Sequence, residues 1–127
     1  MSWDVVLFSS SEKITSPENI DEAKLIATDF CFVFETHFDN ITKDEDHREI
    51  NGDDFSICYF SGEPASNILV NLYGEAALYP LIDLAIKNSW QIFDTGSGEM
   101  IDLNNPSKNG YKNFQSYLTQ IFNKKDL

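Results

Sequence analysis

The stretch from residue 67 to residue 94 constrains the fold of this chain most strongly. A strand-like run, NILVNLYG, is followed by EAALYPLIDLAIKNS, whose apolar residues share one helical face, and then by a second strand-like run, WQIFD. Proline is tolerated only in the first turn of a helix, so Pro80 predicts a helix that begins between Glu75 and Ala77, with Asn88 as its left-handed terminator. Two such strands should run parallel with a right-handed crossover, which predicts a βαβ unit.

Flanking segments predict further strands. WDVVLF (3–8) is rich in β-branched and aromatic residues, and FSICYF (55–60) is separated from NILVNLYG by SGEPAS, a connection of hairpin length. GEMIDL (98–103) follows WQIFD after a short turn. These runs predict a mainly antiparallel sheet.

Two further helices are expected. Apolar residues at helical spacing from Phe30 to Phe38 predict one of them, with Thr28 or Asp29 as its cap, although FCFVF also fits a buried strand. Tyr111, Phe114, Tyr117, Leu118 and Ile121 predict the other. The expected fold is α+β: a single domain over residues 1–127, with a mixed, mainly antiparallel sheet, one βαβ unit and about three helices packed on it.

The net charge of the chain indicates which classes of binding partner are favoured. The net charge is −12, and residues 1–63 hold four bases and fifteen acids (4 − 15 = −11), whereas residues 64–127 hold five bases and six acids (5 − 6 = −1). Such a field repels nucleic acid and anionic lipid and attracts basic partners. The alternative is that the acidity only keeps the protein soluble.

Cellular location is predicted from what the sequence lacks. No apolar run reaches the roughly 18 residues of a membrane span, and the N-terminus has no basic region of a signal peptide, so a cytoplasmic protein is expected. Cys31 and Cys58 lie in apolar stretches, where free thiols are expected rather than a disulfide. With His37 and His47 they show no metal-ligand spacing, and no metal or other cofactor is predicted.

The acidic run DNITKDEDHREINGDD, residues 39–54, is expected to be an exposed loop or a hairpin at the sheet edge that contributes little to the core. Its spacing fails as a calcium-binding EF-hand loop, because Arg48 falls at a ligand position and Glu49 at the position of the turn glycine. An irregular divalent site is the minor alternative to a solvated loop. The predicted partner-binding residues are Asp44, Glu45, Asp46, Glu49, Asp53 and Asp54.

IFDTGSG, residues 92–98, resembles the catalytic loop of aspartic proteases. That chemistry needs two aspartates sharing one proton, so a single motif would require a dimer, and those proteases are nearly all-β, whereas here the motif lies between predicted helices. We interpret Asp94 as the first residue of a turn, with Gly96 and Gly98 supplying positive φ angles. No catalytic residue is predicted, and a homodimeric acid hydrolase using Asp94 is the enzymatic alternative.

The pattern LYGEAALYPLIDLAIKNSWQIFDTGSGEMIDLNNP, within about residues 68–106, resembles small uncharacterised bacterial proteins, some of which look like immunity proteins of toxin systems. This resemblance transfers no catalytic residue. With the acidic charge it predicts a non-enzymatic binding protein for a basic partner, and a cytosolic accessory domain is the alternative. Tyr59, Tyr73, Tyr79 and Trp90 are expected either in the core or as anchors of an interface ringed by acids.

Overall fold

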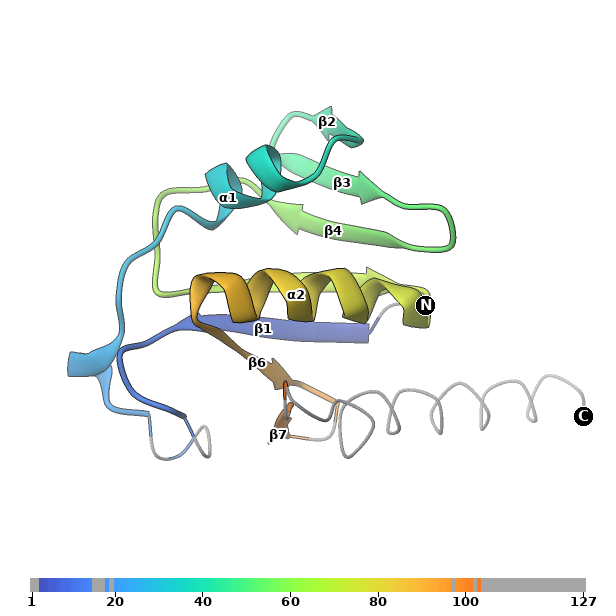
Figure 1. Cartoon of the computed structure of the whole chain (residues 1–127). Helices are drawn as coiled ribbons and strands as arrows, with labels where there is room; N and C mark the ends of the chain where they lie inside the picture. Colours follow the sequence, from blue (N-terminus) through green and yellow to red (C-terminus); the bar gives the residue numbers. More distant parts are fainter. Residues whose placement is uncertain (1–2, 15–17, 19, 97, 102, 104–127) are drawn as a thin grey trace, which may run out of the picture.

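The computed structural model describes residues 3–14, 18, 20–96, 98–101 and 103. In these residues seven strands form one sheet, every neighbouring pair is antiparallel, and the order is β2-β3-β4-β5-β1-β6-β7 (Figure 1). The strands are β1 (Trp3–Ser9), β2 (Ile41–Asp44), β3 (His47–Asn51), β4 (Ser56–Phe60), β5 (Asn67–Tyr73), β6 (Trp90–Asp94) and β7 (Glu99–Met100).

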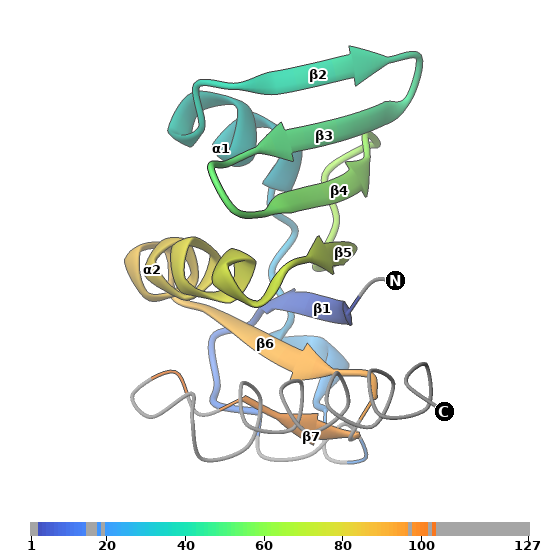
Figure 2. The same cartoon turned by 90° about the vertical axis from the view of Figure 1, so that its right-hand side faces the viewer.

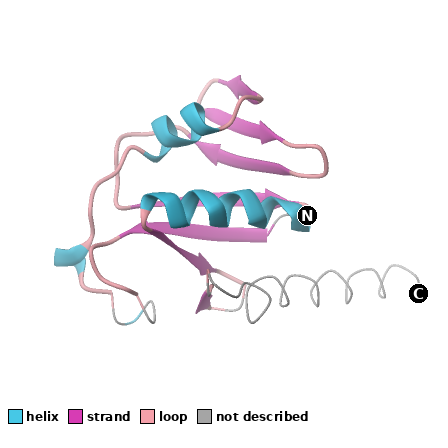
Figure 3. Cartoon of the chain, in the orientation of Figure 1, coloured by secondary structure: helices cyan, strands magenta, loops and turns pink. Residues whose placement is uncertain are grey.

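Both α-helices of the described part, α1 (Phe30–His37) and α2 (Leu78–Asn88), lie on the same side of the sheet (Figures 2 and 3). Two short 3₁₀ helices, η2 (Glu22–Lys24) and η3 (Glu75–Ala77), stand in the connections. The α+β class and the mainly antiparallel sheet are therefore confirmed. The expected helix over residues 111–121 lies outside the described residues, so two of the about three predicted helices are seen.

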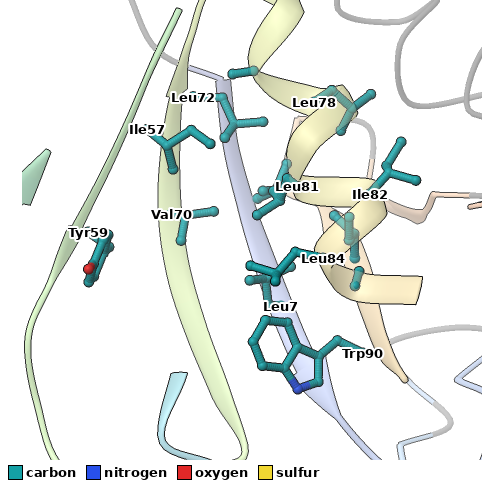
Figure 4. Packing of buried hydrophobic residues seen from close by; sticks show 14 of the residues in the cluster. Leu7, Ile57, Tyr59, Val70, Leu72, Leu78, Leu81, Ile82, Leu84 and Trp90 are labelled. Carbon is teal, nitrogen blue, oxygen red and sulfur yellow. The ribbon is translucent and has the colours of Figure 1, made fainter. Parts of the chain in front are cut away.

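The core fills the space between this sheet face and the helices. Residues of β1 alternate between buried and half-buried from Trp3 to Ser9, as one covered face requires. Figure 4 shows Leu81 and Leu84 of α2 pointing to the sheet, where Leu7, Val70 and Leu72 lie. Tyr59 and Trp90 both belong to this core, where each ring lies within 6.0 Å of the Phe34 ring. The described residues thus share one contiguous core.

Sequence-local rules set the ends of α2. Pro80 is the third residue of the helix, within the first turn, where its missing N–H has no intrahelical partner. The predicted start at 75–77 coincides with η3, which leads directly into α2. The left-handed terminator is Ser89 (φ 59°) rather than the predicted Asn88, whose side-chain Nδ2 instead donates a 2.9 Å hydrogen bond to the Leu84 carbonyl.

Residues 30–37 form the predicted helix, and the alternative strand is wrong. The carboxylate of Asp29 caps α1 by accepting a 3.1 Å hydrogen bond from the Phe32 N–H. Phe30 and Phe34 are the buried residues of the helix, at the spacing of four that puts both on one face. Thr28, the other predicted cap, instead joins a β-bridge with Ala65.

The βαβ prediction is not confirmed as a pair of neighbouring strands. β5 and β6 do run in the same direction, because both are antiparallel to β1, but β1 lies between them and pairs with each. The apolar N-terminal strand β1 is therefore inserted between the two strands of the predicted unit.

Residues 39–54 form the hairpin that was one of the two alternatives for this run. β2 and β3 pair through a two-residue turn, and β2 is the outer strand of the sheet. The low core contribution is correct for most of the segment, but Ile50 is only 2% exposed and belongs to the core. At the other edge, the strand expected over residues 98–103 is reduced to β7.

Candidate functional site

The six predicted binding acids occupy two separate turns and the strand between them. Asp44 ends β2, and Glu45 and Asp46 form the β2–β3 turn, where Glu45 has a positive φ of 54°. Asp53 and Asp54 lie in the β3–β4 turn, at the opposite end of β3. Because a strand rises about 3.4 Å per residue, the five residues of β3 separate the two turns by roughly 15 Å, beyond the Debye length of about 8 Å at physiological salt. The run is therefore two acidic groups rather than one cluster.

The two bases within the segment turn to the helix side of the sheet. Lys43 Nζ lies 2.7 Å from Glu35 Oε1 on α1, and Arg48 Nε lies 3.8 Å from the same oxygen. Arg48 Nη1 also donates to the carbonyl of Glu45, which holds the acidic turn in place. These bases are thus engaged away from the acidic side chains that surround them in sequence.

The six acids keep their charge uncompensated within the described part of the chain. No lysine, arginine or histidine side chain described in the structure comes within 4.0 Å of their carboxylates. All are exposed except Glu49, which is half-buried on β3. The β2–β3 turn in particular presents three adjacent carboxylates to solvent.

The sheet face opposite α1 and α2, here called the open face, carries three strongly exposed apolar side chains: Phe60 by 65%, Leu69 by 52% and Tyr73 by 39%. The strand register places Asp44, His47 and Phe60 in one row across β2, β3 and β4. It places Leu69, Val6, Phe93 and Met100 in one row across β5, β1, β6 and β7. The observed pairing of β4 with β5 ends at Cys58 and Asn71. The acidic edge is thus in line with the exposed Phe60.

A row of polar side chains also crosses the open face. Thr42, Glu49, Cys58, Asn71 and Asp4 are successive partners across the sheet. Asn71 Nδ2 donates a 2.7 Å hydrogen bond to Asp4 Oδ1, which holds that carboxylate against the sheet. The open face therefore combines acceptor groups with exposed apolar side chains.

Sequence reasoning found part of this surface. Of the four aromatic residues singled out, Tyr59 and Trp90 are core, whereas Tyr73 and Tyr79 are exposed. Tyr73 lies on the open face, and Tyr79 lies on α2. Phe60 and Leu69 were missed. For Leu69 a signal was present in the alternation of NILVNLYG, where it precedes the buried Val70. FSICYF gives no such signal for Phe60, because three consecutive residues before it are buried.

The thiol of Cys58 is weakly reactive in this environment. Its Sγ lies 3.9 Å from Glu49 Oε2, and both cysteines are free thiols as predicted. Burial, together with the charge of Glu49 and the hydrogen bond to it, raises the pKa of the Cys58 thiol above its ordinary value. The thiolate is the nucleophilic form, so this cysteine is a poor nucleophile at neutral pH.

Asp94 is a turn carboxylate, as predicted. It is 1% exposed, and its Oδ1 accepts hydrogen bonds from Trp3 Nε1 at 2.8 Å and from the Gly96 N–H at 2.9 Å. Gly98 has the expected positive φ of 74°, but Gly96 does not, and its role is to approach the carboxylate, where a Cβ would lie 3.3 Å from Oδ1. Two donors thus bind one carboxylate oxygen of Asp94 and tie it to β1 and to the turn.

A cavity lies at the other side of the molecule. Its volume is about 540 Å³, and its lining includes Ser10, Trp90 and Met100 near the end of α2. β6 and β7 stand at the opposite end of the strand order from β2. This cavity is therefore separate from the acidic hairpin.

The described residues contain neither a group of side chains that could bind a metal ion nor a membrane-spanning helix. In that part of the chain no three His, Cys, Asp or Glu side chains are grouped to hold a metal ion. None of its helices has the length and hydropathy of a membrane-spanning segment.

No family model, curated protein or solved structure matches this chain. The fold and the open face define it as a small α+β protein with an acidic, partly apolar sheet surface. The resemblance to immunity proteins stays a prediction.

Proposed function

We propose that this protein is a non-enzymatic, acidic binding protein that contacts a basic protein partner through the β2–β3 hairpin and the open face. The observation that carries the proposal is the division of charge on the hairpin. Lys43 and Arg48 are engaged with Glu35 on the helix side, so the acids of the turn keep their full charge toward solvent. A charged surface of this kind accelerates encounter with a partner of opposite sign.

The exposed apolar side chains supply the second element that such an interface needs. Binding energy usually concentrates in a few buried anchors, and charged groups at the rim contribute more to the rate of association than to affinity. Phe60 and Leu69 are exposed on the open face, and Phe60 lies in the same cross-strand row as Asp44. In the proposed complex they are the anchors, and Asp44, Glu45 and Asp46 form the rim.

The partner class we favour is a basic toxin that acts on nucleic acid, with this protein as its immunity-type inhibitor. A cleft that holds phosphates is basic, and carboxylates can occupy it in their place. The proposal includes a cytoplasmic location, which two free cysteines suit because thiols persist in a reducing compartment.

The experiment begins with capture of basic proteins from a bacterial lysate on the immobilised chain. Each captured protein is identified, purified and mixed with this protein at equal concentration. A supporting result is a direct complex that dissociates as salt rises from about 0.1 to about 1 M, which shortens the Debye length from about 10 to about 3 Å. If the captured protein degrades nucleic acid, the complex should also abolish that activity.

A charge-reversed variant of the acidic turn, D44K/E45K/D46K, tests the position of the contact. Each change from acid to lysine adds two charges, so three of them raise the net charge from −12 to −6. The matched control is E22K/E63K/D83K, which has the same net charge but alters exposed acids on η2, the β4–β5 loop and α2. Capture that is indifferent to salt and to the turn variant contradicts the proposal.

A further inference from the structure

The outer strand β2 leaves its far edge unpaired in the described sheet. It is the first strand in the order, and Figure 2 shows no labelled element beyond it. The N–H of Asn51 donates a 2.9 Å hydrogen bond to the carbonyl of Asn40. In an antiparallel pair bonded residues alternate, so Thr42 and Asp44 also bond inward to β3. Ile41 and Lys43 therefore direct their N–H and C=O groups outward.

This edge has only some of the usual protections. Natural sheets blunt exposed edges with proline, bulges, covering segments, very short strands or charged side chains, lysine above all. β2 is short, with four residues, and it carries Lys43, whose side chain lies against Glu35 on the helix side. It contains no proline and pairs with β3 in unbroken register. The opposite edge strand, β7, has only two residues. Within the described sheet, β2 is thus the edge with room for an added strand.

Charge decides which strand would pair there. Thr42 and Asp44 lie on the open face along this edge, and Glu45 and Asp46 continue the acidic surface at its end. A second copy of this chain carries the same acidic turn and the same net charge of −12, which disfavours its approach to this edge. A segment with Lys or Arg on alternate residues would instead place each base on the open face beside the acids.

We propose that β2 accepts an extended basic segment of the partner as an added strand of the sheet. The main-chain hydrogen bonds run to Ile41 and Lys43, and alternate bases of the segment meet Asp44 and the acidic turn. This inference rests on the proposed function and deepens it, because it states how the basic partner is held.

The test uses the full chain and a peptide of about ten residues, the upper length of common strands, with lysine at every second position and valine or threonine between. Amide hydrogen exchange is followed by NMR. At saturating peptide the amides of Ile41 and Lys43 should exchange at least about tenfold more slowly, because each gains a hydrogen bond. Those of Thr42 and Asp44, already bonded to β3, should change little. A peptide of the same composition with its lysines in one block should protect neither pair.

Two variants separate the edge from the charge. Lys43→Pro removes an outward N–H and leaves the bonds to β3 in place, so it should weaken peptide binding by at least about tenfold. Lys43→Gln loses the same contact with Glu35 but keeps the N–H, and its affinity should stay within about threefold of the original.

Three results would overturn the added strand. If peptide binding is salt-sensitive but the amides of Ile41 and Lys43 are not protected, the peptide does not pair with β2. That result leaves the proposed acidic binding function unaffected. Absence of peptide binding to the unaltered protein would also contradict strand addition at β2. Protection of both amides that grows with protein concentration alone would show that a second copy occupies β2. The proposed function fails by a different result, which is capture indifferent to salt and to the turn variant.

Discussion

Trp3 Nε1 donates a 2.8 Å hydrogen bond to Asp94 Oδ1, which joins the first residue of β1 to the last residue of β6. The same oxygen accepts the Gly96 N–H, so one buried carboxylate fixes both a strand pair and the turn that follows it. The Asp-Thr-Gly sequence that resembles a catalytic loop therefore has a structural role at this position.

Asp94→Ala should therefore destabilise the fold, because the buried indole N–H of Trp3 and the part-buried N–H of Gly96 lose this acceptor. The expected loss in the free energy of unfolding is about 2–4 kcal/mol, and Asp94→Asn should cost about 1–2 kcal/mol because the amide oxygen still accepts. Urea denaturation measures both. The matched control is Asp83→Asn on the exposed side of α2, expected within about 0.5 kcal/mol. Equal stability of Asp94→Ala and the unaltered protein would contradict the turn role.

Tyr59→Phe should leave stability at neutral pH unchanged or raise it by about 1 kcal/mol, because the buried hydroxyl has no hydrogen-bond partner among the described residues and its removal ends a desolvation penalty. The same variant should alter the alkaline limb of the stability curve. Burial, together with the charges of Glu35 and Cys31, raises the pKa of Tyr59 well above its ordinary value.

The direction of the pH effect follows from proton binding. Above pH 10 or so the unfolded chain releases the tyrosine proton while the folded chain keeps it, so stability falls as pH rises toward the folded pKa, by up to about 1.4 kcal/mol per pH unit. Urea midpoints from pH 8 to about 11 should show a shallower decline for Tyr59→Phe. A loss above about 1 kcal/mol at neutral pH, or an unchanged alkaline decline, would contradict a buried, unpaired hydroxyl at Tyr59.

Glu35→Gln should cost about 1 kcal/mol, because it removes the charged acceptor that faces both Lys43 and the largely buried Arg48. Lys43→Gln serves as the control, since Lys43 is mostly exposed and such pairs contribute little, about 0.5 kcal/mol or less. Thermal denaturation compares the two. A larger loss of stability for Lys43→Gln than for Glu35→Gln would mean that Glu35 does not stabilise Arg48.

Gly98→Ala should destabilise by about 1 kcal/mol, because its φ of 74° is strained for a residue with a Cβ. Gly62 provides the matched control, because a methyl group added to its Cα would meet no described atom within 4 Å and its φ is not positive. Gly62→Ala should therefore be neutral or slightly stabilising in the same denaturation experiment. Equal effects at the two glycines would contradict the turn geometry.

Local pattern predicted the elements better than their order in the sheet. Alternation and helical spacing located β1, β4, β5, β6, α1 and α2, because each buries a regular face. The central position of β1 depends on non-local pairing, which periodicity does not contain. β2 and β3 were expected only as one of two alternatives, since their charged residues mask the short apolar contribution of Ile50.

The candidate site was predictable in composition but not in arrangement. The acids are visible in the sequence, whereas their separation into two turns follows from the register of β2, β3 and β4. That Lys43 and Arg48 face Glu35 depends on where α1 packs, and the exposure of Phe60 depends on which sheet face the helices cover.

The most direct measurement is the dissociation constant for the captured basic partner, determined by calorimetry at about 0.1 M salt. The unaltered protein, D44K/E45K/D46K and E22K/E63K/D83K are compared side by side. The account predicts that the turn variant weakens binding by at least about tenfold, while the control, at the same net charge of −6, stays within about threefold. Equal weakening by both variants would show that net charge alone attracts the partner and would contradict a binding site at the β2–β3 turn.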